Sequence, residues 1–241
     1  MKTIPFFLSH LLAALLLFTL FWPPSHALWQ TVDIALFKWL NSSLQDRPLW
    51  QLFWACANHK LADWVEDICI LTFFIIHVRS FPSFIRPRKI AELLFCVLYI
   101  AAILYFINRL LFREHLEIPR ISPTLLLQDT VRLSHEIPWL SIKDTSSNSF
   151  PGDHATTALL FATFLSILAS RKMAICAILY GIFLCLPRLI TGAHWFSDIF
   201  VGSGAIVLIT TSWAFFTPFF SGCTKLLEKP LFKLAKRDVK A

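Results

Sequence analysis

Several stretches of this chain are so strongly apolar that they restrict the protein to a membrane. They cover residues 4–22, 64–81, 90–112, 155–170, 173–190 and 199–220. A helix of about 20 apolar residues crosses the roughly 30 Å hydrocarbon core of a bilayer. Charged residues are only 15% of the 241 residues, against about 25% in soluble domains. The sequence therefore predicts an all-α polytopic membrane protein with six transmembrane helices.

The first apolar stretch resembles a signal peptide because it directly follows Lys2. It ends in Phe21-Trp22-Pro23-Pro24, however, and not in the small residues of a cleavage site. We therefore expect residues 4–22 to stay in the protein as its first helix. The sequence contains no internal repeat, so residues 1–241 are predicted to form one membrane-embedded domain that ends in a basic tail at 223–241.

The distribution of charge predicts the orientation of the chain. With the N-terminus in the cytoplasm, the inner segments are residues 79–89, Arg171-Lys172 and the tail, which are basic and almost free of acids. The basic residues of the tail are Lys225, Lys229, Lys233, Lys236, Arg237 and Lys240. Since cytoplasmic loops carry an excess of Lys and Arg, both termini are expected in the cytoplasm. The net charge of +7 then suits anionic membrane lipids, and no nucleic acid partner is expected.

A polar segment, Pro151-Gly152-Asp153-His154, immediately precedes the fourth apolar stretch. Asp153 is a candidate N-cap of the helix that follows, and Gly152 suits the turn into that helix. A helix N-terminus presents unpaired backbone N–H groups and the positive end of the helix dipole, so it can bind a phosphate oxygen. His154 would lie beside that phosphate. The alternative is a capped helix with a histidine at the membrane interface.

A second polar cluster lies between the fifth and sixth apolar stretches. Arg188 closes the fifth stretch, and His194 and Asp198 open the sixth with i,i+4 spacing, which places both side chains on one helix face. An Asp in this position can accept a hydrogen bond from one imidazole nitrogen and leave the other nitrogen as a nucleophile. The alternative is a polar anchor at the membrane interface.

Two further arginines, Arg113 and Arg120, follow the third apolar stretch. An arginine can hold a phosphate through two parallel hydrogen bonds. The predicted topology puts all these residues on the non-cytoplasmic side, namely Arg113, Arg120, His154, Arg188, His194 and Asp198. Asn58 and Asp63, near the outer end of the second stretch, either position a phosphate or anchor the helix.

Together these segments resemble the type 2 phosphatidic acid phosphatase superfamily of membrane enzymes. The third family segment is Ser-Arg-x5-His-x3-Asp, and Arg188, His194 and Asp198 fit its spacing, with Pro187 in place of the serine. The resemblance implies that His194 attacks phosphorus, that Asp198 orients it and that His154 protonates the departing oxygen. The combination of segments is more specific than any one of them.

The other two family segments are matched with substitutions. The family's Pro-Ser-Gly-His becomes Pro151-Gly152-Asp153-His154, and its Lys-x6-Arg-Pro becomes Arg113-x6-Arg120 followed by Ile121. The resemblance implies that Arg120, Arg188 and, less directly, Arg113 bind phosphate. The helix start at Gly152 and Asp153 would contribute to the same site.

The substitutions are similar to those of one subgroup, the inner-membrane phosphotransferases that act on lipid A. The segments Arg120-Ile-Ser-Pro-Thr124 and Gly192-Ala-His-Trp-Phe-Ser-Asp198 carry this similarity. It implies that undecaprenyl diphosphate is the donor, lipid A 1-phosphate the acceptor, and a phosphohistidine the intermediate. The products would be lipid A 1-diphosphate and undecaprenyl phosphate, made at the periplasmic face of the cell inner membrane.

No metal or other cofactor is expected. The six cysteines have no metal-ligand spacing, no carboxylate cluster stands beside the histidines in the sequence, and the arginines would repel a divalent cation. Two other functions stay open: a phosphatase that passes the phosphate of undecaprenyl diphosphate or another lipid to water, and a nonenzymatic lipid transporter that only binds headgroups. A transferase outside the cytoplasm needs a donor that already contains an anhydride, such as undecaprenyl diphosphate.

Overall fold

The structure is a computed structural model that describes residues 2–238, and in this range the regular elements are helices without a β-strand. Lys240, in the predicted basic tail, lies outside the described residues. The helices are α1 (Thr3–Phe21), α2 (Pro23–Ser42), α3 (Pro48–Ala57), α4 (Lys60–Arg79), α5 (Arg86–Ile103), η1 (Leu104–Leu116), α6 (Pro123–Leu126), α7 (Leu133–Glu136), α8 (Asp153–Leu168), α9 (Arg171–Ile190), η2 (Asp198–Ser203), α10 (Gly204–Phe216) and α11 (Phe219–Asp238). The prediction of an all-α fold is confirmed.

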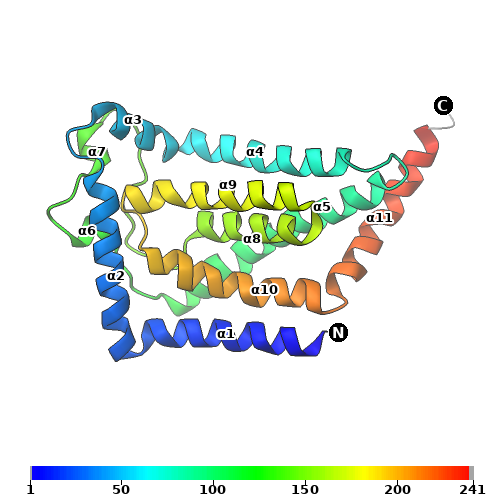
Figure 1. The fold of residues 1–241 in the computed structure, drawn as a ribbon, viewed down its shortest axis with the longest axis horizontal. Coiled ribbons are helices and arrows are strands. Elements are labelled where there is room, and N and C mark those ends of the chain that lie inside the picture. Colours follow the sequence, from blue (N-terminus) through cyan, green and yellow to red (C-terminus); the bar gives the residue numbers. More distant parts are fainter. Residues whose placement is uncertain (1, 239–241) are drawn as a thin grey trace.

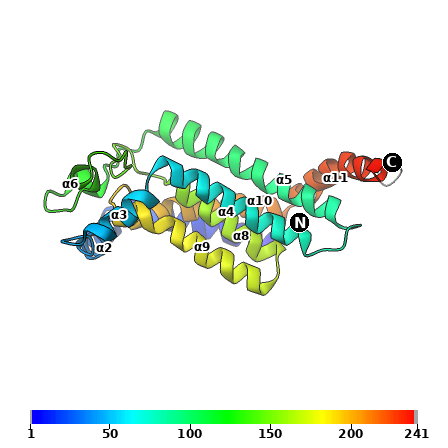
Figure 2. The ribbon, with the colours of Figure 1, turned by 90° about the horizontal axis from the view of Figure 1, so that it is seen from above.

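The long helices α1, α4, α5, α8, α9 and α10 form a bundle in which the chain runs back and forth (Figure 1). α8 packs along α9, α1 along α10, and α11 along α5. Seen from above, α5 and α9 lie on opposite sides with α8 between them (Figure 2). Both ends of the described chain lie at one end of the bundle, and α2, α3, α6 and α7 lie at the other (Figure 1).

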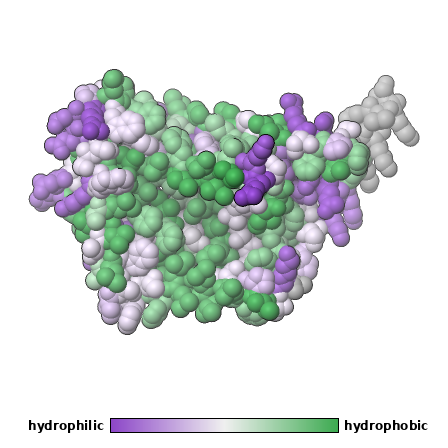
Figure 3. All heavy atoms as spheres, in the orientation of Figure 1, coloured by the Kyte–Doolittle hydropathy of each residue, from purple (hydrophilic) through white to green (hydrophobic). Residues whose placement is uncertain are grey.

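The surface of the bundle is apolar in the middle and polar at its ends. Figure 3 shows hydrophobic residues over most of the central part of one face, with hydrophilic residues near α2 and α3 and along α11. Large apolar side chains such as Leu8, Leu11 and Ile182 are exposed on α1 and α9. A soluble monomer rarely exposes so large an apolar area. The surface is therefore suited to contact with lipid chains.

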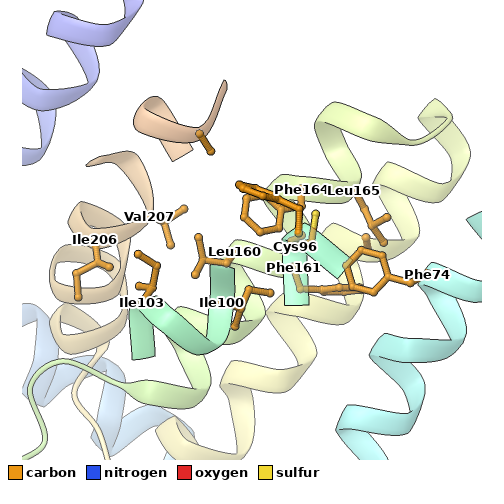
Figure 4. Close-up of a cluster of buried hydrophobic side chains, with 14 residues drawn as sticks. Phe74, Cys96, Ile100, Ile103, Leu160, Phe161, Phe164, Leu165, Ile206 and Val207 are labelled. Atoms are coloured by element: carbon orange, nitrogen blue, oxygen red, sulfur yellow. The ribbon is translucent and has the colours of Figure 1, made fainter. Parts of the chain in front are cut away.

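The main core joins α4, α5, α8 and α10 (Figure 4). Phe161 and Phe164 of α8 are fully buried, and Phe74 of α4 packs against Phe161 with a centroid distance of 5.9 Å. Ile100 of α5 and Val207 of α10 belong to the same cluster. This core fixes α8, which carries the predicted Pro151-to-His154 segment at its N-terminal end.

The predicted count of six spans is not confirmed. By length and composition, four helices of the described chain can cross a membrane: Thr3–Phe21, Arg86–Leu116, Arg171–Ile190 and Asp198–Phe216. The other two predicted spans exist as helices. α8 has 16 residues, about 24 Å at 1.5 Å per residue, and half of it is buried within the bundle. α4 has Asp63, Glu66 and Asp67 in its first turns, where they face other polar groups of the protein.

The segments between the apolar stretches contain helices that hydropathy did not predict. α2 and α3 occupy the loop expected at 23–63, and α11 occupies most of the predicted tail. The sixth stretch was expected to continue to residue 220, but α10 ends at Phe216, two residues before Pro218. Proline disfavours a helical conformation in the residue before it, which accounts for the break.

The close packing of α8 on α9 depends on Gly181. A Cβ atom there would lie 3.1 Å from the Ala158 carbonyl oxygen and 3.2 Å from the Ala162 Cβ. We expect Gly181→Leu to lower the free energy of unfolding by about 1–3 kcal/mol because the two helices must separate. Unfolding of the purified protein in mixed detergent micelles would measure this difference.

Gly222→Leu is the matched control, since a Cβ at Gly222 meets no atom within 4 Å. It should leave stability unchanged or raise it by up to about 1 kcal/mol through helix propensity. Equal stability of the two variants would contradict the close contact of α8 and α9.

Candidate active site

The predicted site residues meet at the end of the bundle opposite the chain termini. They come from η1 and the segment after it, the start of α8, the end of α9, the turn between α9 and η2, and the first residue of η2. The turn depends on Gly192, whose φ of 80° is unfavourable for other residues. A Cβ at Gly192 would also lie 2.5 Å from the Thr124 methyl group. This turn brings His194 back over the N-terminal end of α8.

His194 is held by a backbone carbonyl and not by the predicted aspartate. Its Nδ1 lies 2.7 Å from the Ser149 carbonyl oxygen, whereas Asp198 Oδ2 is 3.6 Å away, too far for a hydrogen bond. A carbonyl only accepts, so Nδ1 must carry the hydrogen. The tautomer inferred from this partner leaves Nε2 with a free lone pair. The expectation that Asp198 fixes the tautomer is therefore not met in this structure, although Asp198 remains near the ring.

Asp198 is fully buried, and its two carboxylate oxygens contact groups other than His194. Its Oδ2 accepts a hydrogen bond from the Trp195 backbone nitrogen at 2.8 Å, and its Oδ1 lies 3.0 Å from Arg120 Nε in an ion pair. The carboxylate thus stabilises the turn that carries His194. It also brings Arg120 to the site from a distant part of the chain.

Arg120 has a second acidic partner, Asp33 of α2, which the sequence did not suggest. Arg120 Nη2 donates to Asp33 Oδ2 at 2.7 Å and to Ser197 Oγ at 2.6 Å. Burial raises the pKa of the Asp33 carboxyl, while its hydrogen bonds from Ser197 and the charge of Arg120 act in the opposite direction. The sequence signal that could have drawn attention to Asp33 is its position between the apolar residues Val32 and Ile34.

Arg188 lies next to the second predicted histidine. Its Nη2 donates to His154 Nε2 at 3.0 Å and to Asp63 Oδ1 at 3.0 Å, and its Nη1 donates to Asn58 Oδ1. Because arginine only donates, His154 Nε2 accepts, and a neutral His154 ring carries its hydrogen on Nδ1. Asn58 and Asp63 lie beside the site, because both contact Arg188. Their role in positioning a phosphate stays a prediction.

A carboxylate cluster stands beside His154, contrary to the expectation from sequence. The ligand atoms of Asp63, Glu66 and His154 lie within 4.8 Å of one another, close enough to hold a metal ion. Helical spacing places Asp63 and Glu66 on the same face of α4. The Arg188 guanidinium already contacts two of these three groups, and Lys143 Nζ lies 2.6 Å from Asp63 Oδ2. Two cations of the protein therefore compete with any metal at this cluster.

Arg113 and Asp153 pair with each other at the edge of the site. Arg113 Nη2 lies 2.5 Å from Asp153 Oδ2, and both side chains are partly exposed. Asp153 is the first residue of α8 and Gly152 is its N-cap, so the predicted cap is displaced by one residue. A Cβ at Gly152 would lie 3.6 Å from His194 Nδ1. The imidazole of His194 therefore lies close to the start of α8.

Two cavities of different character flank the site. One of about 200 Å³ lies beside His154 and is lined by carboxyl groups, including those of Asp63, Glu66 and Asp153. The other, of about 560 Å³, is mostly apolar, and its polar lining includes Arg120 and Asp33. The larger cavity has the character expected for a lipid chain near a charged headgroup.

The comparisons with known proteins find similarity to one family of membrane enzymes. Residues 129–221 match the model of the PAP2 superfamily. This confirms the resemblance seen in the sequence. His154, Arg188, His194 and Asp198 lie within the matched residues, and Arg120 precedes them.

One relative of known function is similar over most of its length. The chain is 28% identical over 213 residues to the lipid A 1-diphosphate synthase of Escherichia coli (strain K12), covering 87% of this chain and 86% of the relative. Among solved structures, the crystal structure of Aquifex aeolicus LpxE matches 76% of this chain and 96% of its own, with 22% identity and a TM-score of 0.43.

The ion pair between Asp63 and Arg188 should contribute to stability. We expect Asp63→Asn to lower the free energy of unfolding by about 1–2 kcal/mol, because it leaves the buried Arg188 without a carboxylate partner. Asp67→Asn is the control: it changes an exposed acid one turn further along α4 and should alter stability by less than about 0.5 kcal/mol. Unfolding in detergent would compare the variants, and equal values would mean that the ion pair adds nothing.

Proposed function

We propose that the protein transfers the terminal phosphate of undecaprenyl diphosphate to the 1-phosphate of lipid A. The products are lipid A 1-diphosphate and undecaprenyl phosphate. The observation that carries this proposal is the hydrogen bond from His194 Nδ1 to the Ser149 carbonyl, because it leaves Nε2 free for attack on phosphorus. The name of the Escherichia coli relative, lipid A 1-diphosphate synthase, supports the choice of acceptor and product.

In the first half of the reaction, His194 Nε2 forms a bond to the terminal phosphorus of the donor. The bond between that phosphorus and the bridging oxygen breaks, and its electron pair leaves with undecaprenyl phosphate. The product on the protein is a phosphohistidine whose ring keeps the hydrogen on Nδ1 and is positively charged. Asp198 Oδ2, 3.6 Å from Nδ1, stabilises this charge through Coulomb attraction.

His154 donates a proton to the leaving oxygen only if its ring carries two protons. In the present arrangement Nε2 accepts a hydrogen bond from Arg188, so it cannot hold a proton at the same time. A substrate phosphate is a stronger partner for the guanidinium than a neutral imidazole. We therefore propose that phosphate binding draws Arg188 away from His154, which allows that ring to be protonated and to act as the acid.

The oxygens of the transferred phosphate need donors that stabilise negative charge. Arg188 and Arg120 supply two of them, together with the first backbone N–H groups of α8, which have no helical acceptor. Arg113 plays a smaller part because Asp153 already balances its charge at the edge of the site. Gly152 lies beside the His194 ring at the start of α8.

In the second half of the reaction, an oxygen of the lipid A 1-phosphate attacks the phosphohistidine phosphorus. The nitrogen–phosphorus bond breaks and its electron pair returns to His194 Nε2, while a new anhydride forms on lipid A. The anhydride of the donor supplies the free energy for the anhydride of the product. Water as the acceptor would make the same enzyme a phosphatase.

We further propose that the site faces the periplasm and that both termini lie in the cytoplasm of a cell with an inner membrane. The site and the termini lie at opposite ends of the bundle (Figure 1). The basic segments 79–89 and Arg171-Lys172 lie at the same end as the termini, as expected for a cytoplasmic face. The whole chain, including the tail at 223–241, is proposed to act as one membrane domain.

A transfer assay with purified protein tests the function. Undecaprenyl diphosphate labelled in its terminal phosphate is incubated with and without lipid A, and both labelled lipid and free phosphate are measured. We expect label to move to lipid A, and His194→Ala to lower this rate by about a thousandfold or more because the nucleophile is gone. His135→Ala, an exposed histidine on α7, is the control and should keep the full rate.

Each outcome of this assay assigns the activity. Label in lipid A that depends on His194 supports the transferase. Free phosphate released at the same rate with or without lipid A, and no labelled lipid A, would assign a phosphatase. Retention of activity in His194→Ala would exclude the proposed nucleophile.

Removal of divalent cations should leave the transfer rate unchanged to within about twofold, because Arg188 and Lys143 already pair with Asp63 in the cluster beside His154 and would repel a metal ion. The measurement compares protein and substrates dialysed against EDTA with samples resupplied with Mg²⁺. A rate that falls tenfold with EDTA and returns with Mg²⁺ would instead indicate a metal at Asp63, Glu66 and His154.

A further inference from the structure

Asp33 lies outside every segment that resembles the family pattern, and outside the matched residues 129–221. It is nevertheless one of the most deeply buried acids of the described chain, with 2% of its surface exposed. Burial of a carboxylate is costly unless it is paired and hydrogen-bonded. Its partners are therefore informative about its role.

Both oxygens of the Asp33 carboxylate are bound by residues of the candidate site. Oδ1 accepts a hydrogen bond from the Ser197 backbone nitrogen at 2.9 Å. Oδ2 accepts from Ser197 Oγ and from Arg120 Nη2, the latter at 2.7 Å. Asp33 thus connects α2 to the residue immediately before Asp198 and, separately, to the arginine that pairs with Asp198.

The contacts of Asp33 limit what Arg120 can do. Nη2 of Arg120 is used by Asp33 and Ser197, and Nε faces Asp198, so among the contacts of the described chain Nη1 is the group left for a phosphate oxygen. One guanidinium is shared by two carboxylates, which gives the cluster a net charge of −1. If the Arg120 side chain turned into the adjacent 560 Å³ cavity, it would break its ion pair with the buried Asp33. Asp33 therefore restricts the position of the Arg120 guanidinium.

We propose that Asp33 is a positioning residue of the transfer reaction, which holds Arg120 against Asp198. This role rests on the proposed function. Asp33 acts through Arg120, directly and through the Ser197 hydroxyl, and not on the transferred phosphate itself. Its loss should therefore lower the rate of the chemical step more than the affinity for the lipid donor.

A double-mutant cycle tests this role with Asp33→Asn, Arg120→Gln and the combined variant. Displacement of a group by about 1 Å can cost about a hundredfold in rate, so we expect Asp33→Asn to lower kcat by about 10- to 100-fold with KM changed by no more than about threefold. If Asp33 acts through Arg120, the combined variant should be no slower than Arg120→Gln alone. Asp46→Asn, at an exposed acid after α2, is the control and should keep the wild-type rate.

The outcomes separate this role from the proposed function. If the losses of kcat in Asp33→Asn and Arg120→Gln multiply in the combined variant, the two residues act independently. That result would overturn the positioning role and leave the proposed transferase activity intact. A loss seen in KM alone would overturn it as well, because it would place Asp33 in substrate binding. A wild-type protein with no activity on any lipid phosphate would overturn the proposed function and this role with it.

A second variant covers the case in which Asp33→Asn does not fold, as judged by size-exclusion chromatography in detergent. Ser197→Ala keeps the buried carboxylate but removes the hydroxyl that contacts both Asp33 and Arg120. Like Asp33→Asn, it should lower kcat, and this effect should disappear when Arg120 is already replaced by glutamine. An effect of Ser197→Ala that is the same in both backgrounds would contradict the proposal.

Discussion

The site depends on the neutralisation of arginines that are largely removed from water. Arg188 is 5% exposed, and an uncompensated buried charge costs several kcal/mol. Asp63 of α4 pairs with Arg188, and Asp33 of α2 pairs with Arg120. Both acids come from the N-terminal part of the chain, ahead of residues 129–221, which match the PAP2 superfamily model. The helices that precede these residues therefore contribute side chains to the candidate site.

The partner of His194 influences the chemistry of its ring. The Ser149 carbonyl oxygen accepts a hydrogen bond from Nδ1, so the neutral tautomer leaves the lone pair of Nε2 free. In the proposed reaction, the carboxylate of Asp198, 3.6 Å from Nδ1, stabilises the positive charge of the phosphohistidine ring. Arg120 pairs with Asp198, which would link the proposed nucleophile to a proposed phosphate-binding residue. Orientation of the His194 ring, which the sequence had assigned to Asp198, is thus provided by the Ser149 carbonyl.

The departures from the family pattern compensate one another in space. Asp153 stands where the pattern has glycine, and Arg113 stands where it has lysine, and the two form an ion pair. Gly152 replaces a serine, and a Cβ atom there would lie 3.6 Å from the His194 ring, an ordinary contact distance. Several substitutions that looked independent in the sequence are thus adjacent in the structure.

Hydropathy alone located α1, α4, α5, α8 and α9 to within a few residues, because contact with lipid selects continuous apolar segments along the chain, but it missed α2 and α11, which have 20 residues each. The motif spacing predicted that His154, Arg188 and His194 lie together, since helices and turns keep nearby residues in a known relation, and the structure places them at one end of the bundle. Only the tertiary structure decided that Ser149 holds His194, that Asp153 neutralises Arg113, and that Asp33 reaches Ser197 across 164 positions of sequence. Those pairs follow from how the helices pack. The partner of a buried charge can come from any part of the chain that packing places beside it, so sequence spacing does not predict it.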